Sequence, residues 1–198
     1  MRIETLDLTK EEHYKEAEKL YLMNEKWLKD DYTPDFKTLA GIIQANLEYN
    51  GKGVICYVNG ELYGILFARI DRFNIADIHA LTNQSHHFFI SQKFLRAFVE
   101  YLFEFEGVNK IKAEVIINNS NSEIACRYAG FTKEGLLRNE RKINSRFHNV
   151  LLLAITRKDY DFQCNKFPNR DRKFYKDIKK ELRSNLLEII RKIKNGRI

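Results

Sequence analysis

The chain has 198 residues, of which 44% are hydrophobic and 31% are charged. This composition is sufficient for one packed core, so it excludes a largely disordered chain, and the length suits one large domain with an appendage. The formal net charge is +7, and the excess of positive charge lies at the C-terminal end. Residues 162–198 carry twelve Lys and Arg against four Asp and Glu, whereas residues 1–161 carry 22 Lys and Arg against 23 Asp and Glu.

Nothing in the sequence indicates export or insertion into a membrane. No apolar run approaches the roughly 20 residues that a membrane-spanning helix needs, and the N-terminus lacks the apolar core of a signal peptide. The cysteines Cys56, Cys126 and Cys164 are odd in number and far apart, which fits neither a disulfide framework nor a metal-ligand spacing. We therefore expect a cytoplasmic protein that holds no metal.

The apolar periodicity alternates between that of helices and that of strands. The pair Thr33-Pro34 begins a helix, and Asn59-Gly60 separates two strands with a strong hairpin signal. In chain order the expected elements are strand 2–8, helices 9–28 and 33–50, strands 53–58, 61–72 and 74–82, helix 91–105, strand 110–117, helix 119–129, and strands 131–138 and 149–156. This order predicts a mixed α/β sheet.

A basic amphipathic helix is expected near the C-terminus. Apolar residues recur at helical spacing from Phe174 to Ile193 with basic residues around them, and a polar link after Tyr160 precedes them. We divide the chain into a domain of residues 1–160 and an appendage of residues 161–198. The helix would dock on the body or pair two copies into a homodimer, which we prefer. Alternatively, residues 166–194 would contact nucleic acid or another acidic surface.

Residues 119–138 (NSNSEIACRYAGFTKEGLLR) carry the most specific pattern in the chain. They resemble the N-x-x-[SA]…G-F-x-x-E-G-x-x-R signature of the GNAT superfamily of N-acetyltransferases, and most of all its ribosomal-protein alanine N-acetyltransferase branch. The matching residues are Asn119, Ser122, Gly130, Phe131, Glu134, Gly135 and Arg138. Over residues 1–160 the element order agrees as well. The resemblance implies a mostly antiparallel central sheet flanked by helices, with acetyl-CoA as co-substrate.

Two groups of residues would hold the cofactor. Asn119 and Ser122 lie where a strand ends and a helix begins, so they can cap that helix or hydrogen-bond a ligand. The resemblance implies that they also position the thiol end of the cofactor. The resemblance also puts the cofactor between strands 74–82 and 110–117, beside Ala80, Leu81 and Thr82.

The stretch that corresponds to the family's pyrophosphate loop, residues 82–94 (TNQSHHFFISQKF), departs from the pattern [QR]-x-x-G-x-[GA]. Small residues at a helix N-terminus let backbone N–H groups approach phosphate, yet no glycine lies between Gly64 and Gly107. The candidate cofactor-binding residues in this stretch are His87, Phe89, Ile90, Ser91 and Gln92.

Attack of an amine on a thioester requires a group that accepts the amine's proton. Asp77 and His79 share one face of strand 74–82 and are the candidates, although a solvated sheet face is the alternative interpretation. The resemblance implies a general acid near Tyr128, which is one residue beyond the family's position. The pair His86-His87 lacks nearby ligands for a metal, and we interpret His13 and His148 as structural.

Two functions remain open. The first is acetyl-CoA-dependent transfer of an acetyl group to a primary amine of unknown identity. The alternative is a catalytically inactive GNAT-fold binding module that acts through its basic C-terminal helix on nucleic acid or a protein. Residues 139–146 (NERKINSR), which we expect to connect the last two strands, favour an acidic or phosphorylated acceptor.

Overall fold

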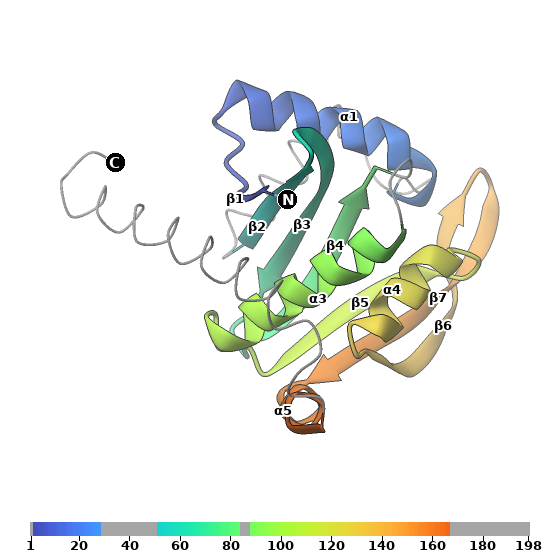
Figure 1. Cartoon of the computed structure of the whole chain (residues 1–198). Coiled ribbons are helices and arrows are strands. Elements are labelled where there is room, and N and C mark those ends of the chain that lie inside the picture. The colour runs from blue at the N-terminus through green and yellow to red at the C-terminus, as the bar shows by residue number, and fades with distance from the viewer. Residues whose placement is uncertain (1, 29–50, 84–87, 167–198) are drawn as a thin grey trace.

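In the computed structural model, which describes residues 2–28, 51–83 and 88–166, seven strands form one mixed sheet between two layers of helices (Figure 1). The elements are β1 Arg2–Thr5, α1 Glu11–Leu28, β2 Gly51–Val58, β3 Glu61–Ile70, β4 Ile75–Thr82, α3 Phe88–Glu104, β5 Lys110–Ile116, α4 Ser120–Tyr128, β6 Thr132–Ile143, β7 Arg146–Thr156 and α5 Arg157–Lys166. The strand order is β1-β2-β3-β4-β5-β7-β6, and β4 with β5 is the parallel pair among antiparallel neighbours. The expected mixed, mostly antiparallel sheet is confirmed.

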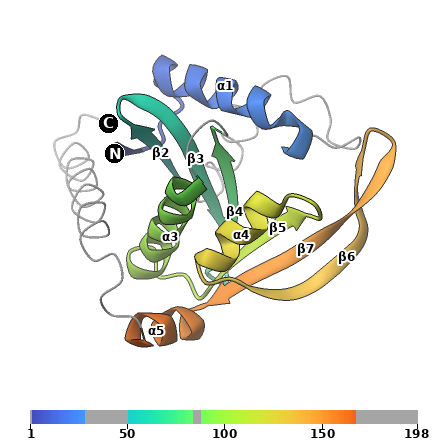
Figure 2. The same ribbon diagram turned by 45° about the vertical axis from the view of Figure 1, so that its right-hand side comes forward.

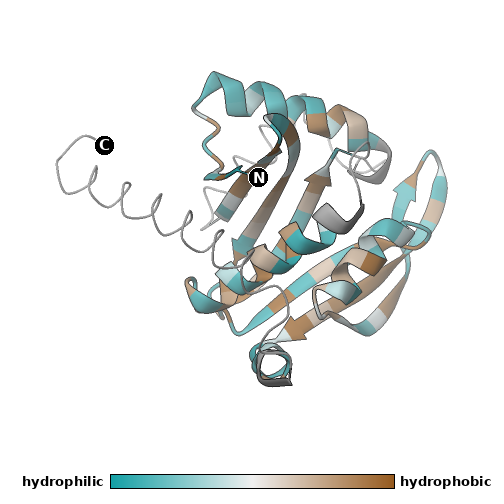
Figure 3. Ribbon diagram, viewed as in Figure 1, coloured by the Kyte–Doolittle hydropathy of each residue, from teal (hydrophilic) through white to brown (hydrophobic). Residues whose placement is uncertain are grey.

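The sheet is covered on both faces, which explains why β2 and β3 are nearly continuous apolar runs. Val54 and Leu66 pack with α3 in one cluster, whereas Ile55 and Phe67 pack with α1 in a second cluster on the opposite face. The two helical layers are visible in Figure 2, and Figure 3 shows apolar residues concentrated in the central strands. A core on each side therefore fixes the position of β4 at the centre of the sheet.

The sheet opens between β4 and β5. These two strands pair only over residues 75–77 and 110–112, and beyond that β4 pairs with β3 and β5 pairs with β7. Figures 1 and 2 show the two strands diverging from that point. The divergence leaves one edge of β4 facing a gap in the middle of the sheet.

The predicted polar connection at residues 139–146 is wrong, because this segment belongs to a long β6–β7 hairpin. The turn residues Asn144 and Ser145 have φ values of 50° and 63°, which is the backbone of a two-residue type I′ turn. An irregular register between Leu137 and Arg141 hides the strand in the sequence, since it breaks the alternation of polar and apolar residues.

The predicted polar link after Tyr160 is also wrong over residues 161–166, which continue helix α5. Thr156 and Asp159 form a capping box: the Thr156 N–H donates to Asp159 Oδ2 at 3.1 Å, and the Asp159 N–H donates to Thr156 Oγ1 at 3.2 Å. Tyr160 is buried and stacks on Phe103, with ring centroids 4.7 Å apart. Helix α5 is therefore anchored to the body of the domain.

Several expectations lie outside the described residues, namely the helix at residues 33–50, the pair His86-His87 and the basic helix beyond Lys166. The division of the chain at residue 160 and the homodimer stay predictions. Among the helices that the structure describes, none is long and apolar enough to cross a membrane.

Candidate functional site

The open edge of β4 presents backbone groups to the gap. The Asn83 N–H donates to the Tyr63 carbonyl at 2.7 Å, so the backbone groups of Asn83 point towards β3. Backbone groups alternate in direction along a strand, and those of Ile78 and Ala80 therefore point away from β3. Ala80 is exposed in the gap, whereas Leu81 is buried under α1 and the Thr82 carbonyl accepts from Asn24 Nδ2 at 3.2 Å. Of these three predicted residues, Ala80 is the one open to a ligand.

The N-terminal part of α3 contributes a buried amide. Gln92 is 5% exposed, and its side-chain amide makes no hydrogen bond to any group in the described part of the chain. Next to it, the Ser91 hydroxyl is hydrogen-bonded to the hydroxyl of Tyr63, and burial raises the pKa of Tyr63 to about 12. A buried polar group without a partner is unfavourable, so the Gln92 amide is suited to a ligand. His87 and the side chains of Phe89 and Ile90 lie outside the described residues.

Helix α4 begins where β5 ends, on the other side of the gap. The Asn119 N–H donates to the Ile116 carbonyl at 3.0 Å, and Asn118 adopts the positive φ of 79° that this tight turn requires. Asn119 then caps α4, since its Oδ1 accepts from the Ser122 N–H at 3.4 Å. The capping interpretation of Asn119 is confirmed, and the half-buried Ser122 lies in the first turn that it caps.

Tyr128 lies at the other end of α4 from these two residues. Tyr128 lies six positions after Ser122 in the helix, a rise of about 9 Å along the axis. Its side chain is 46% exposed and shares a helix face with the exposed Ile124. The structure therefore groups Asn119 with Ser122 and leaves Tyr128 apart from them.

The two predicted base candidates lie on the face of β4 that is opposite α3. Asp77 forms ion pairs with Lys112 Nζ at 3.0 Å and Arg69 Nη2 at 3.8 Å, at the end where β4 and β5 still pair. His79 lies two residues further into the gap, and its ring stacks on the buried Phe67 with centroids 4.8 Å apart. Asp77 is thus part of an ion-pair cluster, whereas His79 is held in place by an aromatic neighbour.

His79 is neutral at physiological pH. It keeps an exposed edge, but the protein surrounding it on the sheet face lowers its pKa to about 4, chiefly by desolvation. The positive charges of Arg141 and Arg69 lower the pKa further, while the carboxylate of Asp77 opposes them. The Arg141 guanidinium pairs with Glu114 of β5 at 3.5 Å, so its charge lies over β5 rather than on β4.

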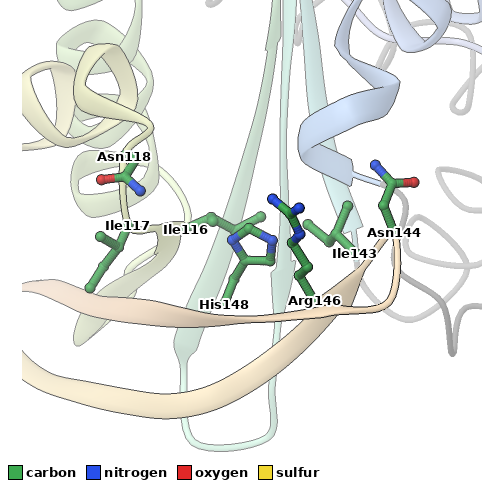
Figure 4. Close-up of a pocket in the computed structure, with 7 residues that line it drawn as sticks. All are labelled: Ile116, Ile117, Asn118, Ile143, Asn144, Arg146 and His148. Atoms are coloured by element: carbon green, nitrogen blue, oxygen red, sulfur yellow. The ribbon is translucent and has the colours of Figure 1, made fainter.

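A cavity of about 560 Å³ opens on the sheet beside β5 and the β6–β7 hairpin (Figure 4). Its lining residues are Ile116, Ile117, Asn118, Ile143, Asn144, Arg146 and His148. Figure 4 shows the side chains of Arg146 and His148 rising from β7 into this space. Sequence reasoning missed both residues, because it placed Arg146 in a loop and interpreted His148 as structural.

Two further predictions concern the role of His13 and metal binding. His13 is buried, and its Nδ1 accepts from the Asp7 N–H at 3.1 Å, so the structural interpretation of His13 is confirmed. Within the described ranges, no group of three His, Cys, Asp or Glu side chains is arranged to hold a metal ion.

The fold is similar to that of solved acetyltransferases. A single-site mutant of the spermidine N-acetyltransferase SpeG from Vibrio cholerae superposes with a TM-score of 0.67 at 17% identity, covering 81% of this chain and 97% of that one. RimJ from Mycobacterium smegmatis, solved with a CoA-disulfide, gives 0.64 at 16% identity over 80% and 87% of the two chains. RimL, a ribosomal L7/L12 alpha-N-protein acetyltransferase solved with coenzyme A, gives 0.64 at 20% identity over 78% and 92%.

The chain therefore has the GNAT acetyltransferase fold, as the resemblance in residues 119–138 implied. No protein-family profile and no curated protein matches the sequence itself.

Proposed function

We propose that this protein is an acetyl-CoA-dependent N-acetyltransferase that binds the cofactor in the gap between β4 and β5. The observation that carries the proposal is the short pairing of these strands, which leaves the Ile78 and Ala80 backbone groups open to the amides of an extended ligand. The unpartnered amide of Gln92 supports the same location, because it lies in the helix that follows β4. The similar fold of RimJ and RimL, both solved with CoA derivatives, is the supporting comparison.

The reaction is a direct transfer. The amine nitrogen attacks the thioester carbonyl carbon, a C–N bond forms, the C–S bond breaks, and the sulfur leaves with the electron pair of that bond. A thiol with a pKa of about 8.5 can leave as the anion near neutral pH. The backbone N–H of Ile78 or Ala80 would stabilise the charge that develops on the carbonyl oxygen.

We assign the proton acceptor to His79 and a positioning role to Asp77. His79 lies further into the gap and, among the residues that the structure describes, makes no ion pair that would block it, whereas Asp77 is engaged by two cations. His79 therefore takes the amine's proton through a water molecule. Asn119 and Ser122 hold the thiol end at the start of α4. This assignment predicts that His79→Ala lowers kcat/KM by about 10²-fold. Full activity in an Asp77→Ala/His79→Ala double variant would remove both assignments.

The role of Tyr128 as general acid stays a prediction from resemblance. Since its ring is 46% exposed at the far end of α4, we expect Tyr128→Phe to change kcat by no more than about twofold, rather than by the ~10²-fold typical of a lost general acid. A loss of 10²-fold or more would restore the assignment.

The first test is the binding of acetyl-CoA to the purified protein by isothermal titration calorimetry. Ala80→Trp fills the gap beside the exposed Ala80, so we expect it to weaken binding at least tenfold without lowering the melting temperature. Lys133→Trp, at an exposed position on β6, is the matched control and should bind normally. No binding by the unmodified protein at millimolar cofactor would overturn the proposed function and favour a non-catalytic binding module.

A further inference from the structure

The hairpin β6–β7 carries its basic residues on two different faces. Ile143 pairs with Arg146 and Arg141 with His148, so these four residues share the face that borders the cavity. Lys142 pairs with Phe147 on the other face, and its Nζ lies 5.9 Å from the centre of the Phe147 ring. The turn at Asn144-Ser145 therefore directs Arg146 to the cavity and Lys142 away from it.

The acidic side chains on the cavity side of β4 and β5 are already paired. Asp77 is engaged by Lys112 and Arg69, and Glu114 by Arg141 at 3.5 Å. None of the seven lining residues is acidic, and neither Arg146 nor His148 has an acidic partner among the residues that the structure describes. The cavity thus has an excess of positive charge that a ligand can neutralise.

The cavity lies where an acceptor amine would bind, so its positive charge would act on the acceptor. It borders the end of β5, on the same sheet face as His79, and the charge of Arg141 already acts on His79. An amine close to His79 would therefore place its remaining atoms towards Arg146 and His148. A guanidinium binds carboxylate or phosphate with two parallel hydrogen bonds, which a cationic chain cannot accept.

We infer that Arg146 and His148 select an amine acceptor that carries an anionic group, a carboxylate or a phosphate, and disfavour polycationic amines. The inference rests on the proposed acetyl transfer and adds the class of acceptor. Arg146 would attract an anionic acceptor and repel a cationic one, and both effects contribute to the choice of acceptor.

The test compares peptide acceptors with a single primary amine and different charge. Three peptides of equal length, beginning Ser-Glu-Glu, Ser-Gln-Gln and Ser-Arg-Arg and free of lysine, are assayed for CoA release beside phosphoethanolamine, β-alanine, ethanolamine and spermidine. We expect kcat/KM to fall from acidic to neutral to basic peptide, by about tenfold or more overall, since a hydrogen bond to a charged group has that effect. The small amines show whether phosphate or carboxylate is preferred.

Two variants decide whether the cavity is the cause. Arg146→Glu should reverse the order of the three peptides, whereas Lys142→Glu, the same charge change on the outer face, should leave it unchanged. A flat or basic-preferring order in an active protein, or reversal in both variants, would overturn the inference while leaving acetyl transfer intact.

Binding gives a readout that does not depend on turnover. The acidic and basic peptides are titrated calorimetrically into the protein with CoA bound, and the acidic peptide should bind at least tenfold more tightly in low salt. Equal or weaker binding of the acidic peptide contradicts the inference. Failure of CoA itself to bind instead contradicts the proposed function.

Discussion

At the residue scale, Gln92 allows cofactor binding to be separated from folding. Its amide is buried without a hydrogen bond to a described group, so an apolar side chain of similar shape removes an unfavourable burial rather than a contact. We predict that Gln92→Met leaves the free energy of unfolding unchanged or raises it, yet weakens acetyl-CoA binding about tenfold. Urea denaturation and calorimetric titration measure the two quantities.

Gln163 offers the matched control for that experiment. Its amide accepts from Arg96 Nη1 at 2.7 Å and donates to the Gly130 carbonyl at 3.1 Å. Gln163→Met should therefore lose about 1–2 kcal/mol of stability and keep its affinity for acetyl-CoA. Equal destabilisation by both changes would show that Gln92 is a structural residue.

The lowered pKa of His79 predicts how the free energy of unfolding depends on pH. Its pKa is about 4 in the folded protein and about 6.5 when unfolded, so between these values the unfolded chain binds a proton that the folded chain does not. Stability contributed by this group is present above pH 6.5 and is lost as the pH falls towards 4. We expect His79→Gln to flatten the pH dependence of the urea midpoint in that window. An unchanged slope would mean that His79 titrates normally.

At the scale of elements, the contact between α4 and α5 depends on a glycine. Gly130 follows α4 with φ of 100°, and a Cβ there would overlap the amide of Gln163. Gly130→Ala should therefore lose about 1–3 kcal/mol, from the left-handed backbone and the clash together. Adding Gln163→Ala removes the clash, so the double variant should lose less than the sum of the two single losses in urea denaturation. Strict additivity would locate the whole effect in the backbone of Gly130.

Elements with short-range signals were predictable from the sequence. Asn59-Gly60 indicated the β2–β3 hairpin, and both residues have the positive φ of that turn. Asn119 was expected as a helix cap and is one. In contrast, the bulge near Asn139 hid the second half of β6, because a register shift breaks the period on which strand prediction depends. The start of α5 was missed as well, although Thr156 with Asp159 indicates it as a capping box in which Asp replaces the usual Glu.

The candidate site was less predictable than the fold, for a physical reason. Asp77 and His79 could be placed on one face of a strand by alternation alone. Arg146 and His148 reach the cavity only because the hairpin turn lies at Asn144-Ser145, and a one-residue change of register would turn both away. Long-range register of this kind is set by the packing of the whole sheet, which no local pattern in the sequence reports.

At the scale of the whole molecule, the open sheet separates two binding tasks. Helix α3, which contains Gln92, contacts β4, and helix α4, which Asn119 caps, contacts β5. The cavity with Arg146 is bounded by the β6–β7 hairpin. A thioester in the gap and an amine in the cavity would therefore meet near His79 from different sides. This arrangement predicts that a change at Arg146 alters the acceptor preference without altering cofactor binding.

The last prediction concerns where the functional unit ends. Tyr160 and Gln163 tie α5 to Phe103, Arg96 and Gly130, so we expect the functional unit to include α5 up to Lys166. A chain ended after Lys166 should keep its melting temperature and bind acetyl-CoA within about threefold of the full chain, because every described contact is retained.

A chain ended after Tyr160 lacks Gln163 and should be less stable by about 1–2 kcal/mol. Thermal unfolding and calorimetry compare the two shortened chains with the full one, and chromatography with light scattering gives their mass. If the chain ended after Lys166 loses cofactor binding, residues 167–198 belong to the catalytic unit. If the chain ended after Lys166 still binds the cofactor but no longer forms a dimer or binds nucleic acid, residues 167–198 act as the separate appendage that their charge predicts.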